Sequence, residues 1–582
     1  MPLLPQISAP SAQNVITDTF LGYNHNIKIG PGEMYDTENI STKYYPLLAP
    51  RGKRGFVEKL SDCGGLLAKE KLAYAAGGKL YYGGEETALE LSGGEKKLVS
   101  MGAYICVFPD KAYYNTADPT DYGSMEAFFS STGPVTYSMC KADGSEYATP
   151  TVSDTAPASP DNGALWIDTT RLPHVLKQWS SATEEWSSIP TVYTKISFIT
   201  TGEIPELFKV YDGVQIEGAA TEEVNGDKVI YALGGGEDET DYIVVIGLLE
   251  QTLESESSVK ISRRVPEMDH VIECNNRLWG CHYGNDGKQN LNEIYCCALG
   301  DFKNWRQYMG LSTDSWTASV GSDGPWTGAV NYLGYPMFFK EDRIHRVTVS
   351  SVGAHSTDET PCSGVQPGSE KSLIVINNTL YYKARSGICA YQGGFPTEIS
   401  KALGDVKYSA AVSGTIEDKL YISMKEDKAD YSLFVYDTRT GLWSREDELH
   451  CVSFATLGEE LYTLTEDGRL LALLGTEGEQ EDFVGWSATS GIMYWQYTNR
   501  KYISRFNLRL SMEEGAELDI YVEYDSSGQW ERQGRVQQKG TGSVLVPVRP
   551  RRCDHLRIKL EGKGEIRLFS IAKVIEIGSD RR

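Results

Sequence analysis

The sequence lacks several features that define common functional classes. No window approaches about 18 consecutive apolar residues, and residues 1–14 have no basic stretch followed by an apolar one. We therefore expect a soluble chain, synthesised in the cytoplasm, without membrane insertion. The sequence also has no GxxxxGK[ST] phosphate loop, no GxSxG elbow and no CxxC pair. These absences exclude the usual nucleotide-binding, α/β-hydrolase and zinc-binding motifs.

Histidine and cysteine are sparse. No two of the 8 histidines have the spacing of an HExxH zinc site, and the 11 cysteines show no regular framework. The closest approach to a metal cluster is Cys274, Cys281–His282 and Cys296–Cys297. Successive residues of a strand face opposite sides, so these are interpreted as structural thiols. We expect reduced, mostly buried cysteines, no metal-ligating residues, no cofactor-binding residues and no cofactor.

Positive charge is also scarce. The chain has 56 Lys and Arg against 80 Asp and Glu, a formal charge of −24, which disfavours tight binding to a phosphate backbone. Residues 500–582 differ, with 17 Lys and Arg against 12 Asp and Glu. They carry +5, whereas residues 1–499 carry −29. This asymmetry indicates a separate C-terminal module with its own partner surface.

What the sequence does contain is a repeated strand-turn-strand unit. Tyr (35) far exceeds Phe (16), and 58 glycines suit short strands joined by tight turns. Similar units recur at roughly 35–50 residues, the spacing of β-propeller blades. They include LAYAAGGKLYYGGEE, NNRLWGCHYG with NEIYCCALGDFKNW, LGYPMFFKEDRIHRVTV, SLIVINNTLYYKARSGICAYQGG, DKLYISMKEDKADYSLFVYDTRTGLW and LGEELYTLTEDGRLLALLG. A stack of unrelated β-sandwiches remains the alternative, because no Trp-Asp or kelch signature is present.

The predicted fold is all-β, a β-propeller with an inserted β-rich domain and a C-terminal, jelly-roll-like β-sandwich. Residues 486–582 contain five alternating strands typical of a sandwich. The N-terminal residues could lie on a neighbouring subunit or form a disordered tail. The expected divisions are an extended arm (1–19), first blades (20–140), an insertion (141–267), remaining blades (268–485) and the sandwich (486–582).

Catalytic candidates are few. A propeller rich in aromatic residues suggests sialidase-like glycoside hydrolysis, which needs paired carboxylates or an Arg cluster around a Tyr nucleophile. The segment SVGSDGPW (residues 319–326) is a compressed and single version of a sialidase Asp-box. Glu446, Asp447 and Glu448 could supply carboxylates, but adjacent acids are more often a solvated turn. We therefore predict no catalytic residues and no enzymatic activity.

Several stretches resemble a known group of proteins. Residues 20–55, 276–305, 372–404 and 433–447 are similar to propeller-type structural virion proteins of tailed bacteriophages and of prophages of Gram-positive bacteria, and residues 547–571 are similar to the sandwich that often ends them. This group includes tail, tail-nozzle and packaged-DNA-stabilisation proteins. None of these motifs is catalytic, so no functional residue is carried over.

The resemblance implies a non-enzymatic structural protein of a virion tail or neck. We expect a homo-oligomeric ring of six-fold symmetry around the DNA conduit, like a tail nozzle or head–tail connector, bound to other tail and neck proteins. Genomic DNA would pass during ejection without specific binding. Acidic residues lining such a conduit would repel phosphates, although acidic surfaces also simply aid solubility. The alternative is a phage host-surface, carbohydrate-binding adhesin; a sialidase-like glycoside hydrolase is less favoured.

Overall fold

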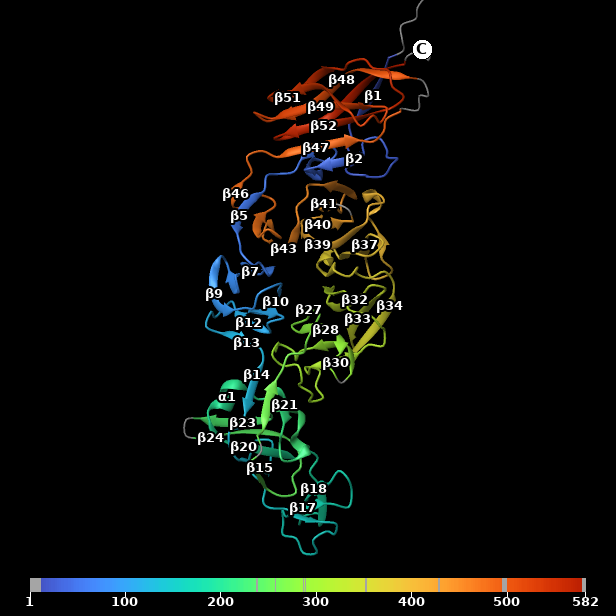
Figure 1. The fold of residues 1–582 in the computed structure, drawn as a ribbon. Coiled ribbons are helices and arrows are strands. Elements are labelled where there is room, and N and C mark those ends of the chain that lie inside the picture. The colour runs from blue at the N-terminus through green and yellow to red at the C-terminus, as the bar shows by residue number, and fades with distance from the viewer. Residues whose placement is uncertain are drawn as a thin grey trace, which may run out of the picture.

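The chain forms three β-rich parts arranged end to end (Figure 1). A computed structural model describes residues 12–236, 239–256, 258–285, 287, 289–350, 353–427, 430–494 and 500–577. The C-terminal sandwich lies at one end, the propeller in the middle and the insertion at the other end. Within the described residues, helix is limited to short segments: α1 (Glu203–Leu207), η1 (Thr42–Tyr44), η2 (Glu222–Val224), η3 (Glu370–Ser372) and η4 (Lys401–Leu403). The predicted all-β class is confirmed.

The central part consists of seven antiparallel sheets that follow one another along the chain. Blade 1 is β6 (Gly65–Ala68), β7 (Leu72–Ala76), β8 (Lys79–Tyr82) and β9 (Glu85–Glu90). Blade 2 is β10 (Lys97–Met101), β11 (Tyr104–Phe108), β12 (Ala112–Asn115) and β13 (Tyr122–Ser124). Blade 3 is β27 (His270–Glu273), β28 (Leu278–Asn285), β29 (Asn290–Cys296) and β30 (Trp316–Ser319). Blade 4 is β31 (Gly328–Tyr332), β32 (Tyr335–Lys340), β33 (Arg343–Val349) and β34 (His355–Pro361).

The remaining three blades complete the ring. Blade 5 is β35 (Ile374–Ile376), β36 (Thr379–Lys383), β37 (Ile388–Tyr391) and β38 (Thr397–Glu398). Blade 6 is β39 (Tyr408–Ile416), β40 (Lys419–Glu426), β41 (Tyr431–Asp437) and β42 (Leu442–Arg445). Blade 7 is β43 (Cys451–Leu457), β44 (Glu460–Thr465) and β45 (Arg469–Ala472), extended by β5 (Gly55–Lys59) and β46 (Glu479–Gln480).

The seven sheets close on themselves as a β-propeller. The first strands of successive blades contact one another in the order β6, β10, β27 and β31, and then β35, β39 and β43, and β43 contacts β6 again. Between blades 4 and 5, the contact runs from β31 through η3 to β36. The N-terminal strand β5 completes the last blade by pairing with β45, with Glu58 opposite Leu470. This pairing joins the start of the propeller to its end. Closing the ring in this way leaves only short, protected sheet edges. The predicted propeller is confirmed, and it has seven blades.

Tight turns explain why these residues form hairpins. The Gly77–Gly78 pair between β7 and β8 has φ values of +56° and +76°, which glycine adopts without steric cost. Asn275–Asn276 and Asn377–Asn378 also have positive φ, and each pair joins two antiparallel strands. Positive φ at both central residues gives the turn that matches strand twist. The Asn-Asn turns expected from the sequence are present.

The insertion enters between blades 2 and 3. Two sheets enclose a single apolar core, and a small third sheet lies beyond them. The insertion spans β14 to β26, so it begins and ends earlier than residues 141–267. Its strands are β14 (Ala127–Ser130), β15 (Val135–Cys140), β16 (Thr151–Ser153), β17 (Leu165–Asp168), β18 (Val175–Ser180), β19 (Glu185–Ser188), β20 (Tyr193–Thr201), β21 (Gly213–Glu217), β22 (Gly226–Val229), β23 (Ala232–Gly236), β24 (Glu239–Ile246), β25 (Leu253–Ser255) and β26 (Lys260–Arg263).

The C-terminal part is a β-sandwich of two sheets, in the orders β1-β53-β48-β51 and β2-β47-β52-β49-β50. Its elements are β47 (Gly485–Ser490), β48 (Lys501–Met512), β49 (Glu517–Tyr524), β50 (Trp530–Val536), β51 (Gly540–Pro547), β52 (Leu556–Lys563) and β53 (Ile566–Ile577). From the N-terminal region it takes β1 (Ala12–Thr17) and β2 (Met34–Glu38), with β3 (Ile40–Ser41) and β4 (Ala49–Pro50) forming a short pair beside it.

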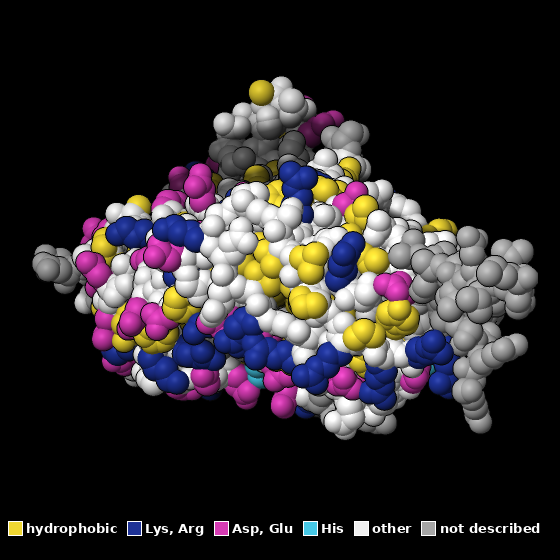
Figure 2. Space-filling view, turned by 90° about the horizontal axis from the view of Figure 1, so that it is seen from above, with side chains coloured by type: hydrophobic (Ala, Val, Ile, Leu, Met, Phe, Trp, Pro, Cys, Tyr) yellow, Lys and Arg dark blue, Asp and Glu magenta, His cyan; other side chains and the backbone are white. Residues whose placement is uncertain are grey.

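The N-terminal region therefore belongs to the C-terminal sandwich of the same chain. Residues 12–17 of the expected arm pair with β53, and residues 1–11 lie outside the described residues. Figure 2 looks onto this end of the molecule and shows many Lys and Arg side chains gathered in a row, with Asp and Glu beside them. The self-association expected from the sequence stays a prediction.

Candidate functional site

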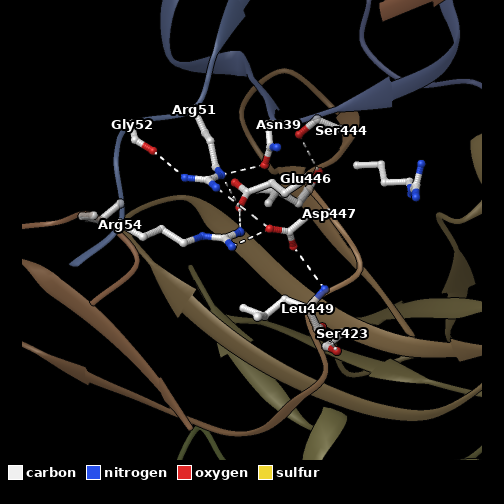
Figure 3. Close-up of polar contacts among 12 residues, drawn as sticks. Asn39, Arg51, Gly52, Arg54, Ser423, Ser444, Glu446, Asp447 and Leu449 are labelled. Carbon is white, nitrogen blue, oxygen red and sulfur yellow. Dashed lines mark hydrogen bonds and ion pairs between the residues drawn. The ribbon is translucent and has the colours of Figure 1, made fainter. Parts of the chain in front are cut away.

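The carboxylates singled out in the sequence, Glu446 and Asp447, are partners in a buried ion-pair cluster (Figure 3). Arg54 donates from Nη2 to Glu446 Oε2 (2.7 Å) and from Nη1 to Asp447 Oδ2 (2.5 Å). Glu446 is only 4% exposed. The interpretation of these acids as a solvated turn is therefore wrong for Glu446 and Asp447, because two arginines from the N-terminal segment reach them.

Arg51 extends the cluster to the end of blade 7. Its Nη1 lies 2.7 Å from Glu481 Oε2, and its Nε donates to Asn39 Oδ1 at 2.7 Å. Burial opposes ionisation of Asp447, but the charges of Arg54 and Arg51 outweigh it, so the pKa of Asp447 lies below its usual value. These ion pairs fasten the segment that enters the propeller. Carboxylates paired in this way are poorly suited to proton transfer.

The cysteines considered for metal binding are buried in apolar surroundings, and Cys274, Cys281 and Cys296 pack in one hydrophobic cluster of blade 3. All eleven cysteines are free thiols, and Cys274, Cys281, Cys296 and Cys297 are buried in blade 3. Burial raises the pKa of Cys274 to about 12. His282 instead contacts Asp269, with Nδ1 3.0 Å from Oδ1. Among the residues the structure describes, no three His, Cys, Asp or Glu side chains are grouped to hold a metal ion. No helix in the same residues is long and apolar enough to cross a membrane.

The central channel of the propeller is crossed by a side chain. Lys371, just before β35, places Nζ 2.9 Å from Glu95 Oε1 and donates to the carbonyl oxygen of Val452 at 2.9 Å. Glu95 precedes blade 2 and Val452 lies in blade 7, so one ammonium group links three sides of the ring. The channel of the single propeller is therefore bridged by this side chain. The DNA conduit expected from the sequence would lie between subunits of a ring and stays a prediction.

A concave surface of about 850 Å³, which we call the interdomain groove, lies in the part of the chain that the structure describes. It lies where the insertion meets blades 2 and 3. Its walls include Glu126, Phe128, Arg264, His282, Glu293 and Tyr308. Grooves at domain interfaces with a few convergent polar groups are the usual place for ligand sites. This groove is therefore the candidate functional site.

The floor of the groove is one face of blade 3. His282 on β28 stands opposite Glu293 on β29, and Gly280 stands opposite Tyr295. Directly opposite residues of a ladder share a face, with Cβ atoms about 4.5–5.5 Å apart. Thr317 lies on the same face through its pairing with Tyr295. Alternation along two strands thus places an imidazole and a carboxylate side by side.

Hydrogen bonds orient both of these groups. Asp269 holds His282 through the 3.0 Å contact at Nδ1 and accepts the Tyr283 backbone N–H at 2.8 Å. The Tyr295 hydroxyl donates to Glu293 Oε2 at 2.7 Å. Burial and this hydrogen bond raise the pKa of Tyr295, so its hydroxyl remains a donor. The floor therefore presents a fixed carboxylate beside an imidazole whose orientation is set by Asp269.

The sides of the groove combine exposed rings with paired charges. Phe128 on β14 of the insertion is 56% exposed, and Tyr308 in the loop after β29 of blade 3 is 50% exposed. Lys111 Nζ lies 3.2 Å from Glu126 and 2.6 Å from Glu267, which balances most of the charge around it. Sequence analysis noticed His282 only as a candidate metal ligand. It missed Glu293, although the strand alternation in LNEIYC could have placed it.

Close packing fixes the two walls relative to each other. The Gly213 backbone N–H donates to Asn304 Oδ1 at 3.0 Å, and Asn304 Nδ2 donates to the Tyr211 carbonyl at 2.9 Å. A Cβ at Gly213 would come within 2.2 Å of the Arg306 carbonyl carbon. Only glycine permits this approach of the insertion to blade 3. The groove is therefore built into the fold.

No protein-family model matches the chain, and no curated protein matches it. Solved structures with a likeness include an exo-β-1,3-galactanase from Phanerochaete chrysosporium, 9% identical over 52% of this chain and 95% of that one, with a TM-score of 0.22. An arabinoxylan arabinofuranohydrolase of glycoside hydrolase family 43 from Bacillus subtilis is 8% identical over 53% and 95%, with a TM-score of 0.20. A puromycin-hydrolysing peptidase from Mycobacterium tuberculosis is 11% identical over 68% and 56%, with a TM-score of 0.25.

These comparisons contradict the predicted function. The solved structures are glycoside hydrolases and a peptidase, not virion proteins, so the predicted structural role in a virion tail or neck is wrong by this finding. These solved structures are enzymes, but none of them shows whether this chain is one. At TM-scores of 0.20–0.25 they carry no argument about chemistry. Function is therefore argued from the residues of the interdomain groove.

Proposed function

We propose that the chain binds a glycan in the interdomain groove. The observation that carries this proposal is a groove of about 850 Å³ that presents half-exposed aromatic rings next to hydrogen-bonding side chains. A pyranose ring has an apolar C–H face, which stacks on Phe128 or Tyr308, and a rim of hydroxyl groups. Carboxylates such as Glu293 and the amides of Asn285 and Gln289 are suited to those hydroxyls.

Charge in the groove favours an uncharged glycan. Its cations are Lys111, Arg264 and Arg306, and its carboxylates are Glu126, Asp227, Glu267 and Glu293. Most of these groups are already paired, Lys111 with two glutamates and Arg306 with Asp227. An acidic polymer would meet a small excess of carboxylates, which costs binding energy. A neutral oligosaccharide meets no such penalty.

Isothermal titration of the full chain with neutral oligosaccharides tests this proposal. We expect Tyr308→Ala and Phe128→Ala each to weaken binding by about tenfold, because a stacked ring contributes about 0.5–1.5 kcal/mol beyond the area it buries. The matched control is Tyr122→Ala, which removes a 41% exposed tyrosine of blade 2 outside the groove. Equal affinity for all variants, or no binding by the unaltered chain, refutes the proposal.

Glycoside hydrolysis is the second candidate, favoured by the carboxylate and imidazole on the groove floor. Glu293 is oriented by Tyr295, and His282 by Asp269, an arrangement suited to general acid and base catalysis. Release of reducing sugar from bound oligosaccharide is the measurement. Glu293→Gln should abolish release while changing affinity less than about tenfold. An unaltered chain that binds but releases no sugar rules out hydrolysis and leaves glycan binding standing.

A further inference from the structure

The insertion ends in a small sheet, β16–β19, at the tip of the molecule farthest from the C-terminal sandwich (Figure 1). One face of this tip sheet is buried. Leu165, Ile167 and Leu176 pack there with Met139 and Val192. His174 Nδ1 also lies 2.6 Å from Glu250 of the larger sheets. The tip sheet is therefore anchored through one face only.

The opposite face of the tip sheet carries three tryptophans. Trp179 and Trp186 are directly opposite each other on β18 and β19, and Trp166 on β17 pairs with Lys177. Strand alternation puts all four side chains on the same face. The ring centroids of Trp186 lie 5.5 Å from Trp179 and 5.4 Å from Trp166. The result is a continuous aromatic surface, which we call the tryptophan face.

The three rings have different roles within this face. Trp166 is 6% exposed, and its Nε1 donates to the Ser153 carbonyl at 3.0 Å, so it supports the others from below. Trp179 and Trp186 are partly exposed. Neither of their indole N–H groups has an acceptor in the described part of the chain. Both rings thus offer an apolar surface with an unused donor at its edge.

Polar groups surround the rings. Lys177 Nζ lies 4.7 Å from the Trp166 ring centre and 2.7 Å from Asp168 Oδ2. Ser188 lies on the same face through its pairing with Lys177. A surface meant for a membrane or an apolar protein core would leave out such a charged pair. Flat rings bordered by donors and acceptors instead match a sugar ring, with its apolar face and hydroxyl rim.

We infer that the tryptophan face is a second glycan-binding site, one that takes pyranose rings of a polysaccharide chain. Its position supports a polymer as the ligand, because the tip projects away from the propeller and can meet an extended or insoluble surface (Figure 1). The inference does not depend on the interdomain groove, which shares none of these residues. Covering these rings with a ligand is favourable, because a tryptophan side chain can bury about 150–250 Å² of surface.

Sedimentation of the full chain with microcrystalline cellulose, colloidal chitin and purified peptidoglycan tests the inference. We expect the unaltered chain to bind at least one polymer and the double variant Trp179→Ala/Trp186→Ala to bind about tenfold more weakly. The double variant Trp179→Phe/Trp186→Phe keeps flat rings and should retain most binding. The matched control is Trp530→Ala, which removes a partly exposed tryptophan of the C-terminal sandwich.

Two controls separate loss of binding at the tryptophan face from misfolding and from effects on the interdomain groove. Both altered tryptophans lie on the face away from the apolar core of the tip, so the thermal midpoint should change little. Tyr308→Ala, which alters the groove, should leave sedimentation unchanged, and the alanine double variant should still bind soluble oligosaccharides there. Unchanged sedimentation of the alanine double variant overturns the inference. The inference is also overturned if the unaltered chain binds none of the three polymers.

Discussion

Removing Arg54 should open the point where the propeller ring closes. The guanidinium is 5% exposed and bonds both Glu446 and Asp447, whose side chains are 6% and 24% exposed. In Arg54→Ala, Glu446 would keep only Arg51, whose Nε is 4.0 Å away. Removing one partner of a buried ion pair costs about 3–5 kcal/mol, because the remaining charge is left uncompensated. We expect a loss of stability in this range.

Scanning calorimetry of the full chain measures this loss. At about 2 °C or less per kcal/mol for a unit of this size, the propeller transition should fall by about 5 °C. The matched control is Arg385→Ala, because the Arg385 side chain is 82% exposed and its Nε lies 3.2 Å from Glu341 Oε1, whose side chain is 37% exposed. Exposed pairs contribute about 0–1 kcal/mol, so this transition should hardly move.

The outcome depends on the geometry of the charge, not only on its sign. Arg54→Lys keeps a positive charge but cannot bond both carboxylates with a planar fork, so it should recover only part of the stability. If Arg54→Ala and Arg385→Ala lower the transition equally, the buried pair does not close the ring. The reasoning would then be wrong.

Three further predictions follow. The arginines lower the pKa values of Asp447 and Glu481 despite burial. Both carboxylates therefore stabilise the folded chain above their unfolded pKa, and this contribution is lost as pH falls below about 4. The thermal midpoint of Arg54→Ala should respond less to acid than that of the unaltered chain. Burial lowers the pKa of His345 from 6.5 to about 4, so protons bind the unfolded chain first and stability should fall from pH 6.5 towards pH 4; His345→Gln should flatten that part of the midpoint–pH curve. Gly55→Val should prevent pairing of β5, because a Cβ would lie 1.7 Å from the Glu477 carbonyl oxygen; a folded variant with a normal midpoint in calorimetry would contradict this.

Local features of the sequence predicted the elements of the fold. Gly77–Gly78 and Asn377–Asn378 produce tight turns wherever they occur, because their positive φ values suit few other residues. Alternation in the segments that became β48, β49 and β52 likewise predicted the sandwich strands. Turns and strand alternation depend on near neighbours in the chain, so they can be predicted without knowledge of the tertiary structure.

Sites that join distant segments were not predictable in this way. Glu446 looked like part of a solvated turn because nothing nearby in the chain shows that Arg54 will lie 2.7 Å from it. Phe128 and Tyr308 are far apart in the sequence and share a groove only because the insertion packs on blade 3. The sequence does not show how the insertion packs on the propeller. It also does not show the path of the N-terminal segment.

The sequence by itself thus determined that this protein is all-β, with repeated blades, an insertion and a terminal sandwich, because backbone propensity and alternation act locally. Only the tertiary structure decided that there are seven blades, that β5 closes the ring, and that the central channel is crossed by Lys371. It also decided which charges are buried and which rings are exposed. The physical reason is that burial and ion pairing depend on contacts between segments far apart in the chain, and the interdomain groove is formed by such contacts.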